Sequence, residues 1–144
     1  MTKIVLLVED NDDHAELVNQ VLEDENIDMQ VHWARDGQAA LDYLYRKGKH
    51  ADAPRPSLIL LDINMPKKTG LEVLKEVKSD AVLRVIPVVM LTTSDREVEM
   101  QNSYLFGANS FITKPVRFND YIEKIRSLER YWLLTNRFPN FNGP

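Results

Sequence analysis

Residues able to bind a metal ion and to transfer a charged group stand at four places where predicted strands end. They are Glu9 and Asp10, Asp62, Thr92, and Lys114. Three acidic groups gathered in one pocket repel one another and therefore favour a hard divalent cation. Mg²⁺ suits such a pocket because it takes oxygen ligands and is often held by only one or two carboxylates and a substrate phosphate.

Asp62 is the candidate nucleophile of this set. A carboxylate can attack a phosphoryl group and carry it as an aspartyl phosphate. The metal ion and the Lys114 ammonium would neutralise charge on the transferring group, and the Thr92 hydroxyl would bind a phosphoryl oxygen once the bond has formed. These residue types at these positions therefore predict phosphoryl transfer to Asp62.

Five segments are expected to form the strands that position these residues. Residues 4–8, 58–61 and 88–91 are short apolar runs between charged, proline or turn residues, which is typical of fully buried strands. Residues 29–33 alternate between apolar and polar side chains, as a half-buried edge strand does, and residues 110–113 are a further short candidate. The sequence therefore predicts a sheet of five strands.

Segments with helical spacing of apolar residues separate these strands. Residues 17–22, 40–44 and 71–77 each carry one apolar stripe, and residues 120–135 carry a longer one. Strict alternation of strands and helices implies a doubly wound α/β fold, with a five-stranded parallel sheet flanked by five helices. Such sheets carry their chemistry just beyond the carboxyl ends of the strands, where the candidate residues lie.

The start of the fourth helix has its own signal. Residues 94–97 read serine, aspartate, arginine and glutamate, which matches a capping box. In this motif the serine oxygen accepts from the fourth residue's backbone N–H, while the glutamate reaches back. We therefore expect this helix to begin near Asp95.

Composition limits the function further. With 144 residues, 44% of them hydrophobic, the chain is expected to form one domain at 1–135, with an extension at 136–144 too short for an output domain. The net charge of −4 argues against binding nucleic acid. The absence of cysteine excludes disulfides, thiolate metal sites and a cysteine nucleophile, and it fits a cytoplasmic location. No run of about 18 apolar residues occurs, so a membrane span is not expected.

Three separate motifs stand in order along the chain. They are Glu9-Asp10, then Asp-Ile-Asn-Met-Pro-Lys-Lys-Thr-Gly at residues 62–70, then Thr113-Lys114-Pro115. In motifs and in the spacing between them, residues 3–134 closely resemble the CheY-like receiver domains of two-component response regulators. The resemblance implies a phosphoacceptor signalling protein, whose only catalysis is phosphotransfer to itself and its own dephosphorylation.

The resemblance assigns the acceptor and the metal ligands. It implies that Asp62 takes a phosphoryl group from the phosphohistidine of a sensor histidine kinase and becomes 4-aspartylphosphate. Asp10 matches the direct ligand of Mg²⁺, for which Mn²⁺ or Ca²⁺ could substitute, and Glu9 matches a neighbour that acts through water. The backbone carbonyl of Asn64 would complete the ligands. Many members carry aspartate in place of Glu9, so we expect altered water contacts here rather than loss of the metal.

The resemblance also assigns a switch. Thr92 and Phe111 match a pair in which the hydroxyl moves toward the phosphoryl group and the aromatic ring turns inward. Lys114 would pair with the phosphoryl oxygens, and the Lys114–Pro115 bond is a candidate for the cis isomer. An aromatic residue on a short strand is more often a core residue than a switch, so the switch role of Phe111 rests mainly on the resemblance.

The expected output is a contact with another protein. The long connection at 47–56 and the aromatic C-terminal segment resemble those of single-domain regulators that partner cyanobacterial phytochrome histidine kinases. Such relatives often form homodimers through the fourth helix, fifth strand and fifth helix, which here include Tyr104, Leu105 and Phe106. The basic residues around 47–56 either belong to a solvated loop or help to dock a partner protein.

Two other functions compete with this interpretation. The first is a phosphohydrolase with Asp62 as nucleophile, but such enzymes usually need a second aspartate where this chain has Asn64. The second is a metal-free scaffold, which should lack site residues that are all present here. His14, His32 and His50 show no metal-ligand spacing and are expected to be structural or exposed.

Overall fold

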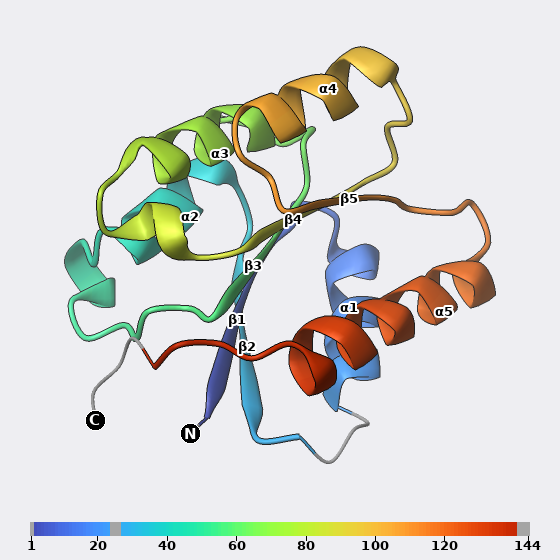
Figure 1. The fold of residues 1–144 in the computed structure, drawn as a ribbon, viewed down its shortest axis with the longest axis horizontal. Helices are drawn as coiled ribbons and strands as arrows, with labels where there is room; N and C mark the ends of the chain where they lie inside the picture. The colour runs from blue at the N-terminus through green and yellow to red at the C-terminus, as the bar shows by residue number, and fades with distance from the viewer. Residues whose placement is uncertain (1, 24–26, 141–144) are drawn as a thin grey trace.

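The strands form a single parallel sheet in the order β2-β1-β3-β4-β5 (Figure 1). The computed structural model describes residues 2–23 and 27–140. The strands are β1 (Lys3–Val8), β2 (Met29–Ala34), β3 (Leu58–Leu61), β4 (Val88–Thr92) and β5 (Ser110–Thr113). All five predicted strands are confirmed, each to within one residue at either end.

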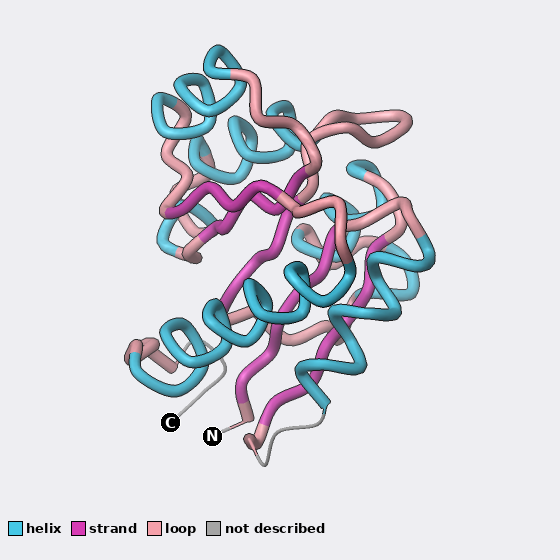
Figure 2. Tube along the Cα trace, turned by 90° about the vertical axis from the view of Figure 1, so that its right-hand side faces the viewer, coloured by secondary structure: helices cyan, strands magenta, loops and turns pink. Residues whose placement is uncertain are grey.

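Helices cover both faces of the sheet, as predicted. They are α1 (Asp12–Glu23), α2 (Gly37–Leu44), α3 (Gly70–Ser79), α4 (Glu97–Leu105) and α5 (Phe118–Leu128). Helices α1 and α5 lie on one face and α2, α3 and α4 on the other (Figures 1 and 2). None of the helices within 2–23 and 27–140 is long and apolar enough to cross a membrane.

Alternate side chains of the central strands pack into two separate hydrophobic cores, one on each face of the sheet. In β1, Val5 and Leu7 pack with α1 and α5, whereas Leu6 and Val8 pack with α2 and α3. All four are almost fully buried, which explains why the strand is a continuous apolar run rather than an alternating one. Burial on both faces holds the strand ends, and so the residues that follow them, in fixed positions.

The register of the strands brings their carboxyl ends together. Val8 pairs with Leu61, and Thr92 pairs with Thr113. The residues that follow β1, β3 and β5 therefore leave the sheet at one edge. This pairing is the reason that residues more than 50 positions apart in sequence can form one site.

The predicted capping box at Ser94 is wrong. Helix α4 begins at Glu97, and its N-cap, Arg96, makes no side-chain capping bond. The Ser94 hydroxyl instead accepts from the Arg96 backbone N–H at 3.3 Å, while the Ser94 N–H donates to the Thr92 hydroxyl at 3.2 Å. These two local bonds hold the segment as a non-helical turn, so the helix starts later.

A capping box does occur at α3. The Thr69 hydroxyl accepts from the backbone N–H of Glu72, and the Glu72 side chain bonds back to the Thr69 N–H. The backbone then passes so close to β3 that a Cβ on Gly70 would lie 1.9 Å from the Asp62 carbonyl oxygen. Only glycine fits at this contact between the start of α3 and the end of β3.

The predicted terminal helix at 120–135 is one helix in outline but changes its winding. Helix α5 is followed by a π-helical turn from Glu129 to Thr135. Leu128 and Leu133 are both buried although they are five positions apart, a spacing that an α-helix would place on different faces. The wider turn lets both face the core that α1 and α5 share, and the Leu133 carbonyl accepts from the Lys3 ammonium at 2.8 Å.

Replacing Gly70 with alanine is expected to lower the free energy of unfolding by about 3 kcal/mol, because the new Cβ has to push apart α3 and β3. Urea unfolding followed by circular dichroism measures this loss. Gly48→Ala is the matched control, since nothing lies within 4 Å of its Cβ position and only its φ of 55° is unfavourable. That control should lose about 1 kcal/mol, and equal losses in the two variants would contradict the crowding at Gly70.

Candidate functional site

The acidic residues predicted to cluster do so at the carboxyl edge of the sheet. Carboxylate oxygens of Glu9, Asp10 and Asp62 lie within 4.8 Å of one another. Glu9 and Asp62 are buried, whereas Asp10 is exposed. The arrangement offers oxygen ligands of different accessibility on two adjacent loops, which fits a hard divalent cation.

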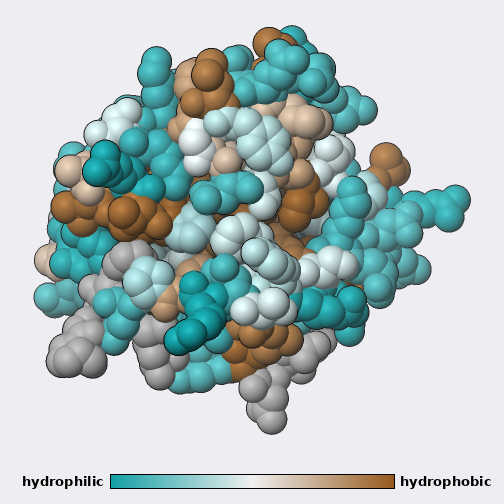
Figure 3. All heavy atoms as spheres, viewed as in Figure 1, coloured by the Kyte–Doolittle hydropathy of each residue, from teal (hydrophilic) through white to brown (hydrophobic). Residues whose placement is uncertain are grey.

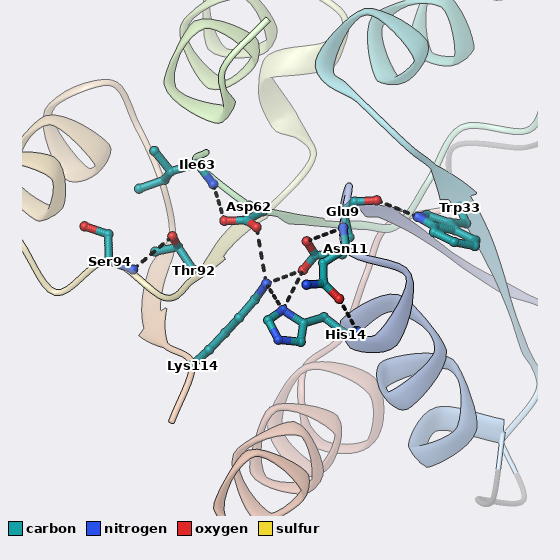
Figure 4. Close-up of polar contacts among 9 residues, drawn as sticks. All are labelled: Glu9, Asn11, His14, Trp33, Asp62, Ile63, Thr92, Ser94 and Lys114. Atoms are coloured by element: carbon teal, nitrogen blue, oxygen red, sulfur yellow. Dashed lines mark hydrogen bonds and ion pairs between the residues drawn. The ribbon is translucent and has the colours of Figure 1, made fainter. Parts of the chain in front are cut away.

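Lys114 comes from the loop after β5 and points into this cluster (Figure 4). Its side chain is 1% exposed. The ammonium contacts a carboxylate oxygen of Glu9 and lies 3.2 Å from Oδ2 of Asp62 and 3.0 Å from Nδ1 of His14. The predicted convergence of Lys114 with the carboxylates is therefore present.

Asp62 is held by contacts on both of its carboxylate oxygens. Oδ1 accepts from the backbone N–H of Ile63 at 2.7 Å, while Oδ2 faces the Lys114 ammonium. Thr92, on neighbouring strand β4, is fully buried beside it (Figure 4). The Thr92 hydroxyl accepts from the Ser94 N–H and retains its own proton as a donor.

The backbone at Glu9 is held from the edge strand β2. The indole N–H of Trp33 donates to the Glu9 carbonyl at 2.8 Å, and the guanidinium of Arg35 lies 4.0 Å from the centre of the Trp33 ring. Arg35 also pairs with Asp12 at 2.6 Å. Sequence reasoning missed Trp33, because the alternation in β2 shows only that its side chain lies on the partly exposed face.

His14 was expected to be structural or exposed, yet it reaches Lys114. The side-chain oxygen of Asn11 accepts from the His14 backbone N–H at 3.0 Å and fixes the first turn of α1. His14 lies in the first turn of α1, which begins two residues after Asp10, and no sequence pattern indicates its contact with Lys114. Burial, followed by the charge of Lys114, lowers the pKa of His14.

The electrostatics of the pocket favour an added cation. Burial, opposed by Lys114 and reinforced by the charge of Asp62, raises the pKa of Glu9 to about 7. A bound cation would stabilise the ionised form of a carboxyl group whose ionisation is made costly by burial. The donor set and its charge therefore fit a divalent metal ion.

The predicted functions of Asn64 and Phe111 stay predictions. Asn64 is exposed, two residues after Asp62. Phe111 is half-buried on β5 and packs against the core that α2 and α3 share with the sheet. This packing agrees with a core role for the ring and leaves its part in a switch untested.

The Lys114–Pro115 bond is trans, and no cis peptide bond occurs within residues 2–23 and 27–140. The predicted cis isomer is therefore wrong for this structure. For a bond to proline the trans isomer is the lower in energy by about 0.5–1 kcal/mol. In this structure, with the trans bond, the Lys114 ammonium contacts Glu9 and Asp62.

Comparison with known proteins identifies the family. Residues 5–126 match the response regulator receiver domain. The chain belongs to the response regulator receiver family. As a receiver, it is a phosphoacceptor signalling protein that is phosphorylated on an aspartate.

Individual relatives of this receiver extend the match. It is 42% identical over 137 residues to response regulator Rcp1 of Synechocystis sp., covering 95% of this chain and 93% of that protein. It is 41% identical over 136 residues to the probable methanogenesis regulatory protein FilR2 of Methanothrix harundinacea, covering 94% and 87%. The chain is therefore related to regulators from a bacterium and from a methanogen.

Solved structures agree with the receiver fold. The phosphorylated cyanobacterial phytochrome response regulator RcpA is similar with a TM-score of 0.94 and 41% identity, covering 96% of this chain and 99% of that one. The Mn²⁺-bound form of response regulator Rcp1 has a TM-score of 0.93 and 42% identity, covering 95% and 99%. The receiver is thus related to phytochrome response regulators.

The affinity of the receiver for divalent metal ions is expected to rise with pH until about pH 7 and then to level off. Below that pH the proton on Glu9 competes with the metal, so each unit of acidification weakens binding by up to about tenfold. Calorimetric titration with Mn²⁺ between about pH 6 and about pH 8 measures this dependence. In Glu9→Gln, which cannot titrate, the rise near pH 7 should be lost. A flat profile in the unaltered chain would be evidence against the raised pKa.

Proposed function

We propose that Asp62 is the residue that accepts the phosphoryl group, and that a sensor histidine kinase supplies it. The phosphorus–nitrogen bond of the kinase's phosphohistidine breaks as an Asp62 carboxylate oxygen forms the new phosphorus–oxygen bond. The electron pair of the broken bond stays on the imidazole, which takes up a proton from solvent. The observation that supports this most is the Lys114 ammonium 3.2 Å from Asp62, in a pocket with two further carboxylates.

Mg²⁺ is the proposed cofactor, with Mn²⁺ or Ca²⁺ as substitutes. Glu9, Asp10 and Asp62 would hold it with the Asn64 carbonyl, and the ion would neutralise charge on the phosphoryl group. The solved structure of response regulator Rcp1 is a Mn²⁺-bound form, which supports this assignment. Lys114 supplies a fixed positive charge of this chain beside Asp62.

Phosphorylation would be transmitted through Thr92 and Phe111. The Thr92 hydroxyl retains a proton that it can donate to a phosphoryl oxygen, and Thr92 is tied to the β4–α4 segment through the Ser94 N–H. Movement of Thr92 toward Asp62 therefore pulls on the segment that leads into α4. We propose that the altered surface of α4, β5 and α5 is what another protein recognises.

A phytochrome histidine kinase is the proposed partner. Support comes from the similarity to RcpA, whose name describes it as a phytochrome response regulator. A kinase has to approach Asp62 from the carboxyl edge of the sheet, where the apolar side chains of Val116 and Phe118 are exposed. A partner with an apolar surface would bury these two residues while bringing its phosphohistidine to Asp62.

We propose residues 1–135 as the receiver unit and 136–144 as an extension of it. Residues 141–144 lie outside the described part of the chain. Within the described part, the ring of Phe138 stacks on that of Trp132 with centroids 6.5 Å apart. The extension therefore adds to the core formed with α1 and α5.

Incubation with acetyl phosphate and Mg²⁺ is expected to add one phosphoryl group to the chain, detected by intact mass. Asp62→Asn should remain unmodified under the same conditions, because an amide lacks the nucleophilic oxygen. Asp42→Asn, which changes an aspartate on α2, is the matched control and should be modified as the unaltered chain is. Continuous turnover of many phosphate esters per chain would instead favour the phosphohydrolase.

A homodimer through α4, β5 and α5 is also proposed. A groove of about 600 Å³ on this face is lined by Met100, Tyr104, Phe111, Tyr131 and Trp132, among others. Figure 3 shows apolar side chains interspersed with polar ones over the side of the molecule seen in Figure 1. The groove therefore has room for side chains of a second copy and offers them apolar contacts along part of its lining.

Leu105→Asp is expected to weaken this dimer by at least about tenfold, because it places a charge on an apolar interface. Leu105 is 78% exposed on α4. Sedimentation equilibrium with and without beryllofluoride, a phosphoryl mimic, measures the dissociation constant. Val82→Asp, at an exposed residue in the connection between α3 and β4, should have no effect. A monomer at high concentration in both conditions would refute the dimer.

A further inference from the structure

The Lys114 ammonium uses all of its hydrogen-bonding capacity. A lysine ammonium has three N–H donors and no acceptor. Its three neighbours here are a Glu9 carboxylate oxygen, Oδ2 of Asp62 at 3.2 Å and Nδ1 of His14 at 3.0 Å (Figure 4). Because the Lys114 side chain is 1% exposed, water cannot readily replace a missing partner.

We propose that His14 is a positioning residue for phosphoryl transfer to Asp62. Its Nδ1 accepts the third N–H of Lys114 and keeps the ammonium directed at Asp62 rather than drawn wholly onto Glu9. The inference rests on the proposed function of Asp62 and adds a residue to it. His14 acts through Lys114, whose ammonium it contacts at 3.0 Å.

The orientation of the His14 ring is determined by two helices. Directly before α1, the side-chain oxygen of Asn11 accepts from the His14 backbone N–H at 3.0 Å and fixes the first turn of this helix. From α5, the Tyr121 ring packs edge-on against the imidazole, with centroids 5.8 Å apart and an interplanar angle of 85°. Tyr121 is 1% exposed, so this contact belongs to the core. The imidazole is therefore held in place before any phosphoryl group arrives.

The chemistry of the contact determines the form of the ring. Lysine ammonium can only donate, so Nδ1 of His14 has to be the unprotonated acceptor, and the proton lies on Nε2. The distance from Nδ1 to the Glu9 oxygen, 3.9 Å, is too long for a competing hydrogen bond.

A neutral acceptor suits this position better than a charged one. Three carboxylates already surround the place where a phosphoryl dianion has to approach. A fourth carboxylate on α1 would also hold Lys114 but would repel the dianion. The imidazole of His14 holds the ammonium without adding negative charge, so the lysine charge remains available to the transferring group.

The test compares rates of Asp62 phosphorylation by acetyl phosphate with Mg²⁺. In this reaction the phosphorus–oxygen bond of the donor breaks, acetate leaves with the electron pair, and the new bond forms to Asp62. His14→Leu, which removes the acceptor, is expected to slow the reaction by about tenfold. His14→Asn places an amide oxygen near the position of Nδ1 and should react within about twofold of the unaltered rate. His50→Leu, the same change away from the site, should leave the rate unchanged.

Helix stability alone predicts the opposite order of these variants. Leucine favours a helix more than asparagine does, so His14→Leu should melt at least as high as His14→Asn. Slower phosphorylation in the more stable variant identifies the hydrogen bond as the cause. A rate for His14→Leu equal to the unaltered one, or equally slow rates for His14→Leu and His14→Asn, would overturn the proposal.

A second measurement does not depend on phosphorylation. In the unaltered protein labelled with ¹⁵N, the imidazole spectrum of His14 should show an unprotonated Nδ1 and a protonated Nε2. Protonation at Nδ1 would overturn the contact with Lys114. If the unaltered chain forms no phosphoryl adduct, the proposed function of Asp62 fails, while this spectrum still decides whether His14 binds Lys114.

Discussion

A single buried ammonium shared by two buried carboxylates is the interaction on which this receiver depends. Removing Lys114, Glu9 and Asp62 from water is costly, and the cost is offset only where the charges contact one another closely. One ammonium cannot neutralise both carboxylates, and Asp10 adds a third negative charge nearby. The folded chain therefore holds a local excess of negative charge that a metal ion can relieve, and this is the environment in which a phosphoryl group has to be accepted.

The sheet makes this charge cluster possible because parallel strands end in register. β1 and β3 are buried on both faces, so their ends have little freedom to move apart. The close passage of Gly70 under the Asp62 carbonyl fixes the loop from the α3 side, and the indole of Trp33 fixes the Glu9 carbonyl from the β2 side. The acids are thus held by backbone and core contacts that do not themselves carry charge.

The positions of the strand-end residues could be predicted from sequence because they depend only on the spacing of apolar residues and on the order of strands and helices along the chain. Five apolar segments alternating with helical ones determine that Glu9, Asp62 and Lys114 meet at one edge. The contacts of His14 and Trp33 could not be predicted, since they depend on how α1 and β2 are rotated against the loops. The error at Ser94 has a similar origin. Residues 94–97 match the sequence of a capping box, but in the structure the Ser94 N–H donates to the neighbouring Thr92 hydroxyl. The π-helical turn after α5 depends on tertiary packing of Leu133 and has no local signal.

The helices around the site differ in how many residues they bury. This difference affects which part of the molecule can move when Asp62 is phosphorylated. Helices α1, α3 and α5 each bury several residues, whereas α4 buries only Ser103. Elements with few buried contacts open at the lowest free energy, so α4 is the helix that a local change moves most readily. Thr92 stands between the rigid acids and this loosely held helix, tied to the segment that precedes it. A new charge on Asp62 would therefore leave the acids and Lys114 in place and shift the weakly anchored side of the molecule.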